Sequence, residues 1–318
     1  MPRTRKPRNG SLQFWPRVRA RRLYPRIKSF KKTVNIKPLE FACYKAGMTH
    51  IQYIDTDNNS PTKNKIVSKA VTILEAPSLL VLALKFYKKS HYGLQSVGEY
   101  WNNKIPDFVR RKYPKNKIKN NYEGDFDDVR LIVSTQPHKI NLKKTPEIFE
   151  IHIDGNDKKK KLEYAKSLLG KEISARDIFN EGEYVDVTSI TKGKGFQGPV
   201  KRFGIKIQGR KDKQHHRHVG SVGQERPGKI RWTVARPGQM GLHQRTEYKK
   251  RIIKIGDNGL EFKGGIINYG NIKKDYIIIE GSVPGSKKRL IILRVSIRPK
   301  LSKPVSISYL SKESKQGV

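Results

Sequence analysis

Apolar and polar residues alternate with a period of two along much of this chain, and this alternation predicts short β-strands. It is clear over residues 41–44, 48–54 and 69–75, where β-branched and aromatic side chains alternate with polar ones. Gly47 and the polar cluster at 55–60 supply turns, and Pro77 closes the section. We therefore expect half-buried strands between residues 36 and 77.

The pattern over residues 78–180 is mixed and predicts an α/β insertion. Strands are expected over 81–87, 130–134 and 148–153, and helices over 107–113 and 159–169. Gly170 is placed to cap the second helix, and Ser174 followed by Asp177 resembles the start of a short helix that ends near Phe179. The Lys- and Asn-rich residues 102–128 predict solvated loops.

β character returns after this insertion. Strands are expected over 184–191, 252–255, 266–269, 275–280 and 289–297. Short strands at this spacing, separated by glycine-containing turns, are typical of a small barrel or sandwich. The sequence thus predicts one β body from residues 36–77 and 181–300, interrupted by the 78–180 insertion and followed by a C-terminal tail, residues 301–318.

Residues 192–251 form a basic segment within the second half of this body. It carries 17 Lys or Arg, three acidic residues and ten glycines. A segment with this balance cannot pack a core of its own. Its scattered aromatic residues and a strand-like run at 230–235 distinguish it from a plain disordered tail. We expect a central extension that leaves the body and becomes ordered on a polyanion.

The N-terminal residues 1–35 predict a second basic arm. Residues 1–32 contain 12 Lys or Arg and no acid, and Pro7, Pro16 and Pro25 favour extended backbone. One interpretation is a disordered tail. The other is an arm laid along RNA, with Phe14, Trp15 and Tyr24 against bases or sugars.

The amino-acid composition indicates which kinds of partner the protein binds. The 318 residues include 68 Lys or Arg against 28 Asp or Glu, a formal charge of +40, which calls for a partner that carries phosphates. The single cysteine, Cys43, excludes a disulfide framework and cysteine-based zinc clusters. The apolar runs are too short to span a bilayer and no signal peptide is apparent, so we expect a cytosolic protein with no membrane partner.

A glycine motif, GxGxxG at 193–198, follows the strand expected at 184–191. A dinucleotide site would need a helix next, whereas Pro199 comes at once; a kinase would need HRD and DFG strings, which this sequence lacks. The glycines more simply allow one backbone to approach another. We expect no nucleotide, no other cofactor and no small-molecule substrate.

Four histidines also suggest a metal site: His215, His216, His218 and His243. Zinc needs four ligands at orderly spacing, and no cysteine or acidic cluster completes the set among so many cations. We favour RNA contact and expect no metal. No combination of residues indicates catalysis, so we expect no enzyme.

Long motifs then resemble one family. ITKGKGFQGPVKRFG and HVGSVGQERPGKIRWTVARPGQMGLHQRTEY resemble the central extension of the universal large-subunit ribosomal protein three family, and PRNGSLQFWPRVRARR resembles the start of its archaeal and eukaryotic members. FACYKAGMTH, GEYVDVTSITKGKG and INYGNIKKDYIIIEGSVPGSKKRLIILR match further blocks. The resemblance is looser over 78–180, and the length resembles the archaeal type.

This resemblance implies a six-stranded translation-protein-type β-barrel with two extensions that enter large-subunit (23S) rRNA. It implies a structural ribosomal protein that supports subunit assembly, contacts neighbouring ribosomal proteins and reaches towards the peptidyl-transferase centre with a loop that includes Trp232. Together with the charge pattern it gives these rRNA-binding residues: Arg3, Arg5, Lys6, Arg8, Trp15, Arg17, Arg19, Arg21, Arg22, Lys192, Lys194, Lys201, Arg202, Arg210, His215, His216, Arg217, His218, Lys229, Arg231, Trp232, Arg236, Gln239, His243 and Arg245.

One position departs from the eukaryotic pattern. Those members carry a Trp-His-Pro string where this chain has Gln224-Glu225-Arg226-Pro227, so the histidine modified in them has no counterpart here. The local sequence resembles the bacterial version instead, which implies that Gln224 is a candidate for methylation.

Two other functions remain open on the sequence. An RNA-modifying enzyme, or another translation-associated RNA-binding β-barrel protein, would need a cofactor pocket or a phosphate-binding loop, and the string GxxxxGK[ST] is absent. A DNA-compacting basic protein would not need the aromatic residues of the central extension.

Overall fold

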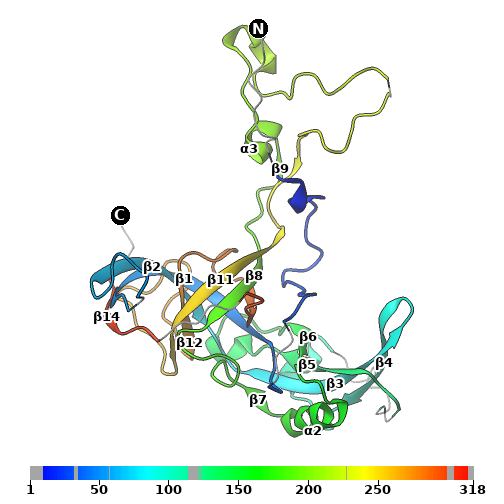
Figure 1. Cartoon of the computed structure of the whole chain (residues 1–318), viewed down its shortest axis with the longest axis vertical. Helices are drawn as coiled ribbons and strands as arrows, with labels where there is room; N and C mark the ends of the chain where they lie inside the picture. Colours follow the sequence, from blue (N-terminus) through cyan, green and yellow to red (C-terminus); the bar gives the residue numbers. More distant parts are fainter. Residues whose placement is uncertain are drawn as a thin grey trace. The chain divides into compact units, whose positions relative to one another are not determined.

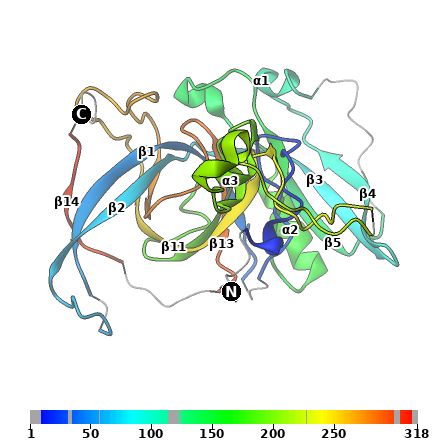
Figure 2. The same ribbon diagram turned by 90° about the horizontal axis from the view of Figure 1, so that it is seen from above.

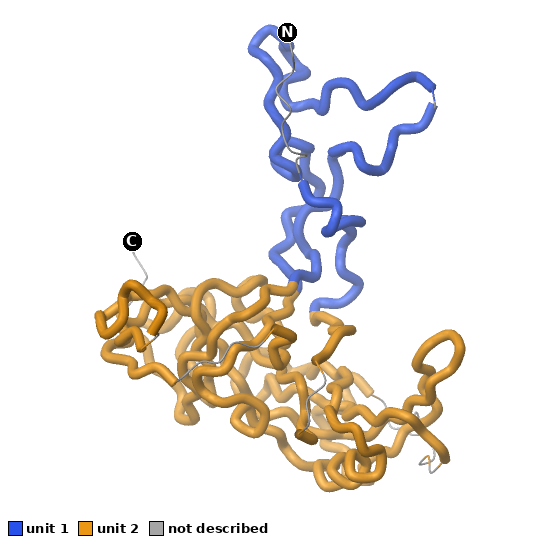
Figure 3. The backbone as a smooth tube through the Cα atoms, in the orientation of Figure 1, with its two compact units in different colours: residues 1–23, 190–245 blue, residues 24–189, 246–318 orange. Residues whose placement is uncertain are grey.

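The chain divides into two compact units in the computed structural model, which describes residues 10–31, 35–56, 58–113, 122, 124–226, 228–298 and 304–313. Unit 1 comprises residues 1–23 and 190–245, and unit 2 comprises residues 24–189 and 246–318 (Figure 3). The N-terminal arm and the central extension, expected as two separate arms, thus share one unit. Residues 24–31 of the expected arm belong to unit 2.

The larger sheet of unit 2 has seven strands among the described residues, in the order β13-β8-β11-β12-β2-β1-β14. Every pair for which a register is given is antiparallel, and β1 also pairs with β13. Figures 1 and 2 show these strands together on one side of the unit. Their bounds are β1 Glu40–Ile54, β2 Ile66–Glu75, β8 Tyr184–Ile190, β11 Gln244–Gly256, β12 Tyr276–Glu280, β13 Leu290–Val295 and β14 Ile307–Leu310.

The second sheet belongs to the insertion and follows the order β4-β3-β5-β6, with β7 also paired to β3. Helix α2 packs on β5 and β3. The bounds are β3 Leu79–Ser90, β4 Gly93–Trp101, β5 Asp128–Ser134, β6 Ile148–His152, β7 Glu172–Ile173, α1 Asp107–Arg110, η3 Pro137–Ile140 and α2 Lys158–Leu168. Residues 78–180 therefore contain both a sheet and helices.

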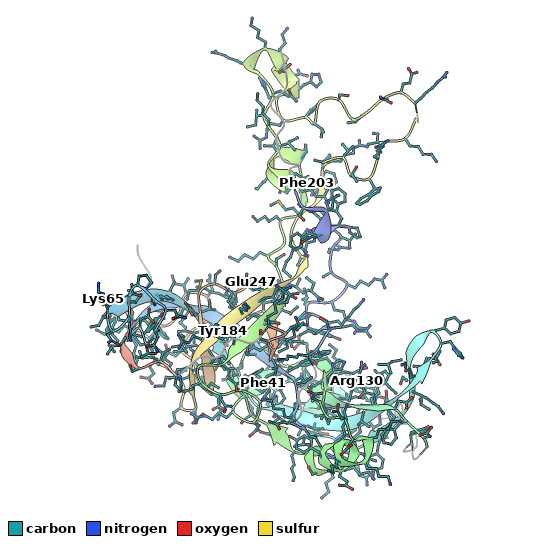
Figure 4. All side chains as sticks on the ribbon, viewed as in Figure 1. Phe41, Lys65, Arg130, Tyr184, Phe203 and Glu247 are labelled. Carbon is teal, nitrogen blue, oxygen red and sulfur yellow. The ribbon has the colours of Figure 1, made fainter. Side chains whose placement is uncertain are left out.

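Both sheets of unit 2 contribute to one hydrophobic cluster. It joins Phe41 of β1, Leu131 of β5 and Ile277 of β12, none of which exposes any surface. Figure 4 labels Phe41 inside this unit and Lys65 at its surface, beside the end of the β1–β2 hairpin. Burial at this scale supplies the main stabilisation of unit 2.

A buried carboxylate ties three of these strands together. Asp186 on β8 is fully buried, and its Oδ2 accepts hydrogen bonds from Nε and Nη2 of Arg294 on β13, at 3.2 and 3.1 Å. Its Oδ1 accepts from the backbone N–H of Lys249 on β11 (3.1 Å) and from the hydroxyl of Ser296 (3.0 Å). The pair is charged, buried and satisfied, which is the condition for an internal ion pair to be tolerated.

Several expected elements differ in the structure. Residues 41–44 and 48–54 form one strand, β1, because a register shift between Lys45 and Gly47 absorbs the break in alternation. Residues 174–179 form a turn and no helix: the Asp177 carboxylate accepts from the Ser174 N–H at 2.6 Å. Residues 266–269 contain only an isolated bridge between Ile266 and Gly270.

Strands β4 and β14 were not predicted. Residues 93–97 at the start of β4 are all exposed, so the buried half of the usual alternation is missing there. β14 has four residues, too few for a pattern to emerge. Conversely, the strand expected over 230–235 is not formed, and residues 232 and 233 lie in a turn.

Candidate nucleic-acid interface

Unit 1 is built from a very basic stretch of sequence. Residues 10–23 and 190–245 contain 18 Lys or Arg and two acids, Asp212 and Glu225. Two carboxylates leave such a unit strongly positive. Its regular elements are short: η1 Leu12–Phe14, β9 Phe196–Gln197, α3 Pro199–Phe203, η4 Arg210–His215 and β10 Gly238–Gln239.

The two ends of the central extension approach each other closely. β9 pairs with β10, and beside this ladder Lys194 N donates to Met240 O (3.0 Å) while Met240 N donates to Gly195 O (2.9 Å). Gly241, at φ +74°, lies against the opposite backbone: a Cβ there would be 2.0 Å from the carbonyl oxygen of Lys192. Glycine is required at this crossing.

A helix begins directly after the glycine motif, at Pro199, where the sequence predicts none. α3 has Pro199 in its first turn, where a proline costs no hydrogen bond, and Gly204 at φ +67° ends it. The helix has only five residues. The strand that follows it, β10, pairs antiparallel with β9, unlike the parallel strands of the βαβ unit in a dinucleotide site.

Arg202 on α3 crosslinks the unit through backbone carbonyls. It donates from Nε to Gln239 O (3.0 Å), from Nη1 to Arg236 O (2.9 Å) and from Nη2 to Arg17 O (3.3 Å). Arg17 returns a bond from Nη1 to Arg202 O (3.0 Å). Burial, and then the neighbouring Arg17 cation, lower the pKa of Arg202; an arginine pKa starts so high that the side chain stays charged.

An aromatic cluster packs beside this arginine pair. Trp15 stacks on Phe203 with ring centroids 5.5 Å apart, and Trp232 meets Trp15 edge-on at 5.6 Å. The Arg17 guanidinium lies 4.3 Å from the centroid of Phe203, close enough for a cation–π contact. Figure 4 labels Phe203 within unit 1. The aromatic residues thus give the unit a small core shared by arm and extension.

His243 makes a second contact between the extension and the N-terminal arm. Its ring Nδ1 lies 2.9 Å from Val18 O, which can only accept, so the Nδ1–H tautomer donates; Ala20 N also donates to Leu242 O (2.7 Å). Burial lowers the pKa of His243; the bond to Val18 opposes this, and the cations Arg245, Arg17 and Arg202 add to it. The neutral ring is therefore the form that the structure favours.

The expected RNA-binding residues fall into two groups. Six take part in packing within unit 1: Trp15, Arg17, Arg202 and His243 as described, Gln239, whose Nε2 donates to Met240 O and Gly241 O, and Arg245, which lies 4.8 Å from the Phe14 centroid. Another group is exposed: Arg19, Arg21, Arg22, Lys192, Lys194, Lys201, Arg210, His215, Arg217, His218, Lys229, Arg231, Trp232 and Arg236, while His216 is half-buried. Arg3, Arg5, Lys6 and Arg8 lie outside the described residues.

The outer loop of the extension holds the remaining candidates. His215 and His218 face each other with their Nδ1 atoms 3.1 Å apart. No group of three or more potential metal ligands occurs among the residues that the structure describes. Gln224 is exposed, as a modified side chain would need to be. Trp232 keeps 67% of its surface exposed despite its contact with Trp15.

The second half of the N-terminal arm, from Tyr24 onward, belongs to unit 2 and packs on its core. Ile27 is buried in the main cluster, and Tyr24 packs against it with its ring 6.1 Å from that of Phe149. Ser29 accepts from Nη1 of Arg294 through its hydroxyl (2.9 Å). Tyr24, expected from the sequence to contact RNA, therefore makes a contact within the protein.

Sequence reasoning missed Phe203, Gly241 and the backbone role of Arg202. A signal for Phe203 was present, since it is the aromatic residue that directly follows Lys201 and Arg202 in the KRFG string. No local pattern indicates which carbonyls an arginine will reach.

The arrangement defines a class of protein: a β-rich body joined to a packed, glycine-punctuated cationic unit. The exposed residues of that unit include many Lys and Arg and the aromatic Phe14, Phe196 and Trp232, which suit phosphates and bases. None of the described helices is long and apolar enough to cross a membrane.

Comparison with known proteins identifies the family within that class. The family model described as Ribosomal protein L3 matches residues 1–127 and 121–317, and the chain belongs to this family. It is 51% identical over 317 residues to a protein of Nanoarchaeum equitans, covering 96% of each chain. Identity is 46% to a protein of Archaeoglobus fulgidus (98% of each chain) and 45% to one of Methanothermobacter thermautotrophicus (100% of each). All three relatives are named large ribosomal subunit protein uL3.

Proposed function

We propose that this protein is a structural constituent of the large ribosomal subunit in the cytoplasm and that it binds 23S rRNA. The observation that carries the proposal is the match to archaeal large-subunit proteins over nearly the whole length of both chains. The strongly positive unit 1 supports it, because two acids among 18 Lys and Arg leave a surface that a polyanion must neutralise.

Within that role, unit 1 is the principal RNA-binding part. Its exposed cations contact phosphates, while Trp232 offers a partly free ring to a base. The central extension reaches towards the peptidyl-transferase centre, as the family resemblance implies, and early binding of the unit helps the subunit to assemble beside other ribosomal proteins. Methylation at Gln224 belongs to the same proposal and rests on its exposure and its sequence context.

The larger sheet of unit 2 supports the same proposed function. Six strands return on themselves through the β13–β1 pairing, in the order β13-β8-β11-β12-β2-β1. We propose that they close a barrel of the translation-protein type, into which residues 78–180 are inserted. Residues 36–77 and 181–300, outside the extension, then form this barrel domain.

Ultraviolet crosslinking in intact cells, followed by mapping of RNA-linked peptides, tests this function. Peptides from 192–245 should carry large-subunit rRNA, and the protein should sediment with large subunits. Sedimentation apart from ribosomes, or crosslinks confined to other nucleic acids, would refute the proposal.

A further inference from the structure

The β3–β4 hairpin of the insertion carries a solvent-exposed aromatic tip. β3 pairs with β5 only as far as Tyr87, opposite Asp128, so the last part of the hairpin pairs with itself alone. In this tip, residues 88–97, Tyr92 is 96% exposed, Leu94 49% and Val97 41%. Figure 1 shows the hairpin extending past the strands β5 and β6 of its own sheet.

The turn of this hairpin fixes the backbone that holds Tyr92. The Ser90 hydroxyl donates to Gly93 O (3.0 Å) and accepts from Tyr92 N (3.3 Å). Gly93 adopts φ +107°, which a residue with a side chain rarely adopts. The tyrosine is therefore presented from an ordered turn, and binding a flat partner costs little additional backbone order.

Exposed apolar side chains on an isolated two-stranded ribbon indicate a partner. Such a ribbon is marginally stable alone, and exposed apolar patches on ordered elements mark interaction surfaces. The tip contacts Asp125 through the Lys88 side chain and Asp127 through the N–H of Lys89.

The charge of the hairpin tip indicates which partner it is. No acid occurs from residue 86 to 98, whereas Lys88, Lys89 and His91 surround the turn in sequence. Lys88 forms an ion pair with Asp125 at 3.3 Å, but both side chains are mostly exposed, at 55% and 78%. Pairs of this kind contribute little stability and can exchange for a phosphate. The Asp127 carboxylate already accepts hydrogen bonds from the Lys158 side chain and from the backbone N–H of Lys89.

We propose that this hairpin tip is a second RNA-binding site, in which Tyr92 stacks on an unpaired base and Lys88 and Lys89 contact the adjoining phosphates. The proposal rests on the function proposed above, since the RNA would be a segment of large-subunit rRNA. It gives the 78–180 insertion a binding role of its own, outside unit 1.

Equilibrium binding of the full-length chain to transcribed large-subunit rRNA tests the site. Tyr92→Ala should weaken binding by about 5- to 150-fold, the loss expected for one base–aromatic stack. Tyr92→Phe should retain binding. The matched control is Tyr309→Ala, which removes another exposed tyrosine, 41% exposed on β14, and should leave binding unchanged. Replacing Lys88 and Lys89 by Gln should lower the salt slope by about 1.4, at roughly 0.7 per single-strand phosphate.

Crosslinking from the tip separates RNA from protein partners. A photoreactive benzophenone side chain at position 92, in ribosomes assembled in cells, should form adducts with rRNA. Adducts with a ribosomal protein alone, or equal rRNA affinity of Tyr92→Ala and the natural chain, would overturn the inference while leaving the proposed function intact. Failure of the natural chain itself to bind the rRNA would overturn both.

Discussion

At the scale of single residues, the guanidinium of Arg202 donates to the backbone carbonyls of Arg17, Arg236 and Gln239. These acceptors come from the arm and from the far side of the extension, so one side chain holds together segments distant in sequence. Hydrogen bonds from a charged donor contribute about 1.5–3 kcal/mol each. A cation that appears in the sequence as one more phosphate ligand is therefore a structural element of unit 1.

Substitution of Arg202 should loosen unit 1 specifically. We expect Arg202→Gln to accelerate amide exchange at Ala20 and Met240 by roughly tenfold or more, since even one such bond lost costs about 1.5 kcal/mol. Lys201→Gln removes the exposed neighbour on the same helix and should leave exchange unchanged. Equal effects of both variants would show that charge, and not the carbonyl contacts, orders the unit.

His243 should make the attachment of the arm sensitive to pH. Its pKa in the folded protein is lowered below the ordinary 6.5. As the pH falls through about 6.5, the unfolded chain takes up the proton first, so stability of the folded unit decreases on acidification. Amide protection at Ala20, corrected for intrinsic exchange, should drop between pH 7.5 and 5.0.

The matched variant for this titration is His243→Gln. Its side chain does not titrate, so the change in Ala20 protection over the same pH range should shrink. If amide protection at Ala20 in the natural chain did not depend on pH, this would contradict a role for the neutral His243 ring.

At the scale of elements, strands with a clear apolar pattern were predictable, and those defined by distant partners were not. The strands around Phe41, Ile73 and Ile277 were expected at nearly their observed positions because each lies in a run of β-branched, aromatic and other apolar residues, and the structure buries consecutive side chains there. β4 and β14 lack such a buried run. In the candidate site, charge located unit 1, but the stacking of Trp15 on Phe203 depends on a contact between segments 188 positions apart that no local pattern encodes.

The stability of the contact between strands β8, β11 and β13 should depend on Asp186. Asp186→Asn keeps the volume but leaves the buried guanidinium of Arg294 without a counter-charge, and breaking such a pair costs about 3–5 kcal/mol. Urea unfolding followed by circular dichroism should show this loss. Asp257→Asn is the control, because its ion pair with Arg176 is more than half exposed and should change stability by about 0.5 kcal/mol or less. Comparable losses in both variants would contradict a special role for the buried network.

At the scale of the whole molecule, the charge is divided unequally between the two units. Unit 1 combines few acids with packing that is mostly aromatic and arginine-mediated. All the ion pairs found between described residues lie in unit 2, including the buried Asp186–Arg294 pair. Binding of RNA by unit 1 should therefore leave the buried Asp186–Arg294 pair of unit 2 unaltered.

Salt dependence offers a measure of that division. Replacing Arg210, Lys229 and Arg231 by Gln should reduce the slope of log affinity against log salt by about 2–3, at roughly 0.7–0.9 per phosphate contact. Lys159→Gln and Lys166→Gln on α2 serve as controls and should leave the slope unchanged. Equal slopes for all variants would place the electrostatic contacts elsewhere.

The pairing of β1 with β13 has a consequence for the order in which the protein is made. Cys43 and Ile291 lie on adjacent strands but are 248 positions apart in the chain. β1 is synthesised long before β13, so one edge of β1 stays unpaired until β13 has been made. The strands of the insertion are nearer to each other in sequence and can form their own sheet during this interval. Contacts of such separation form slowly, and exposed edges invite aggregation. Early capture by RNA, or by a chaperone that shields β1, would protect the nascent chain during this interval.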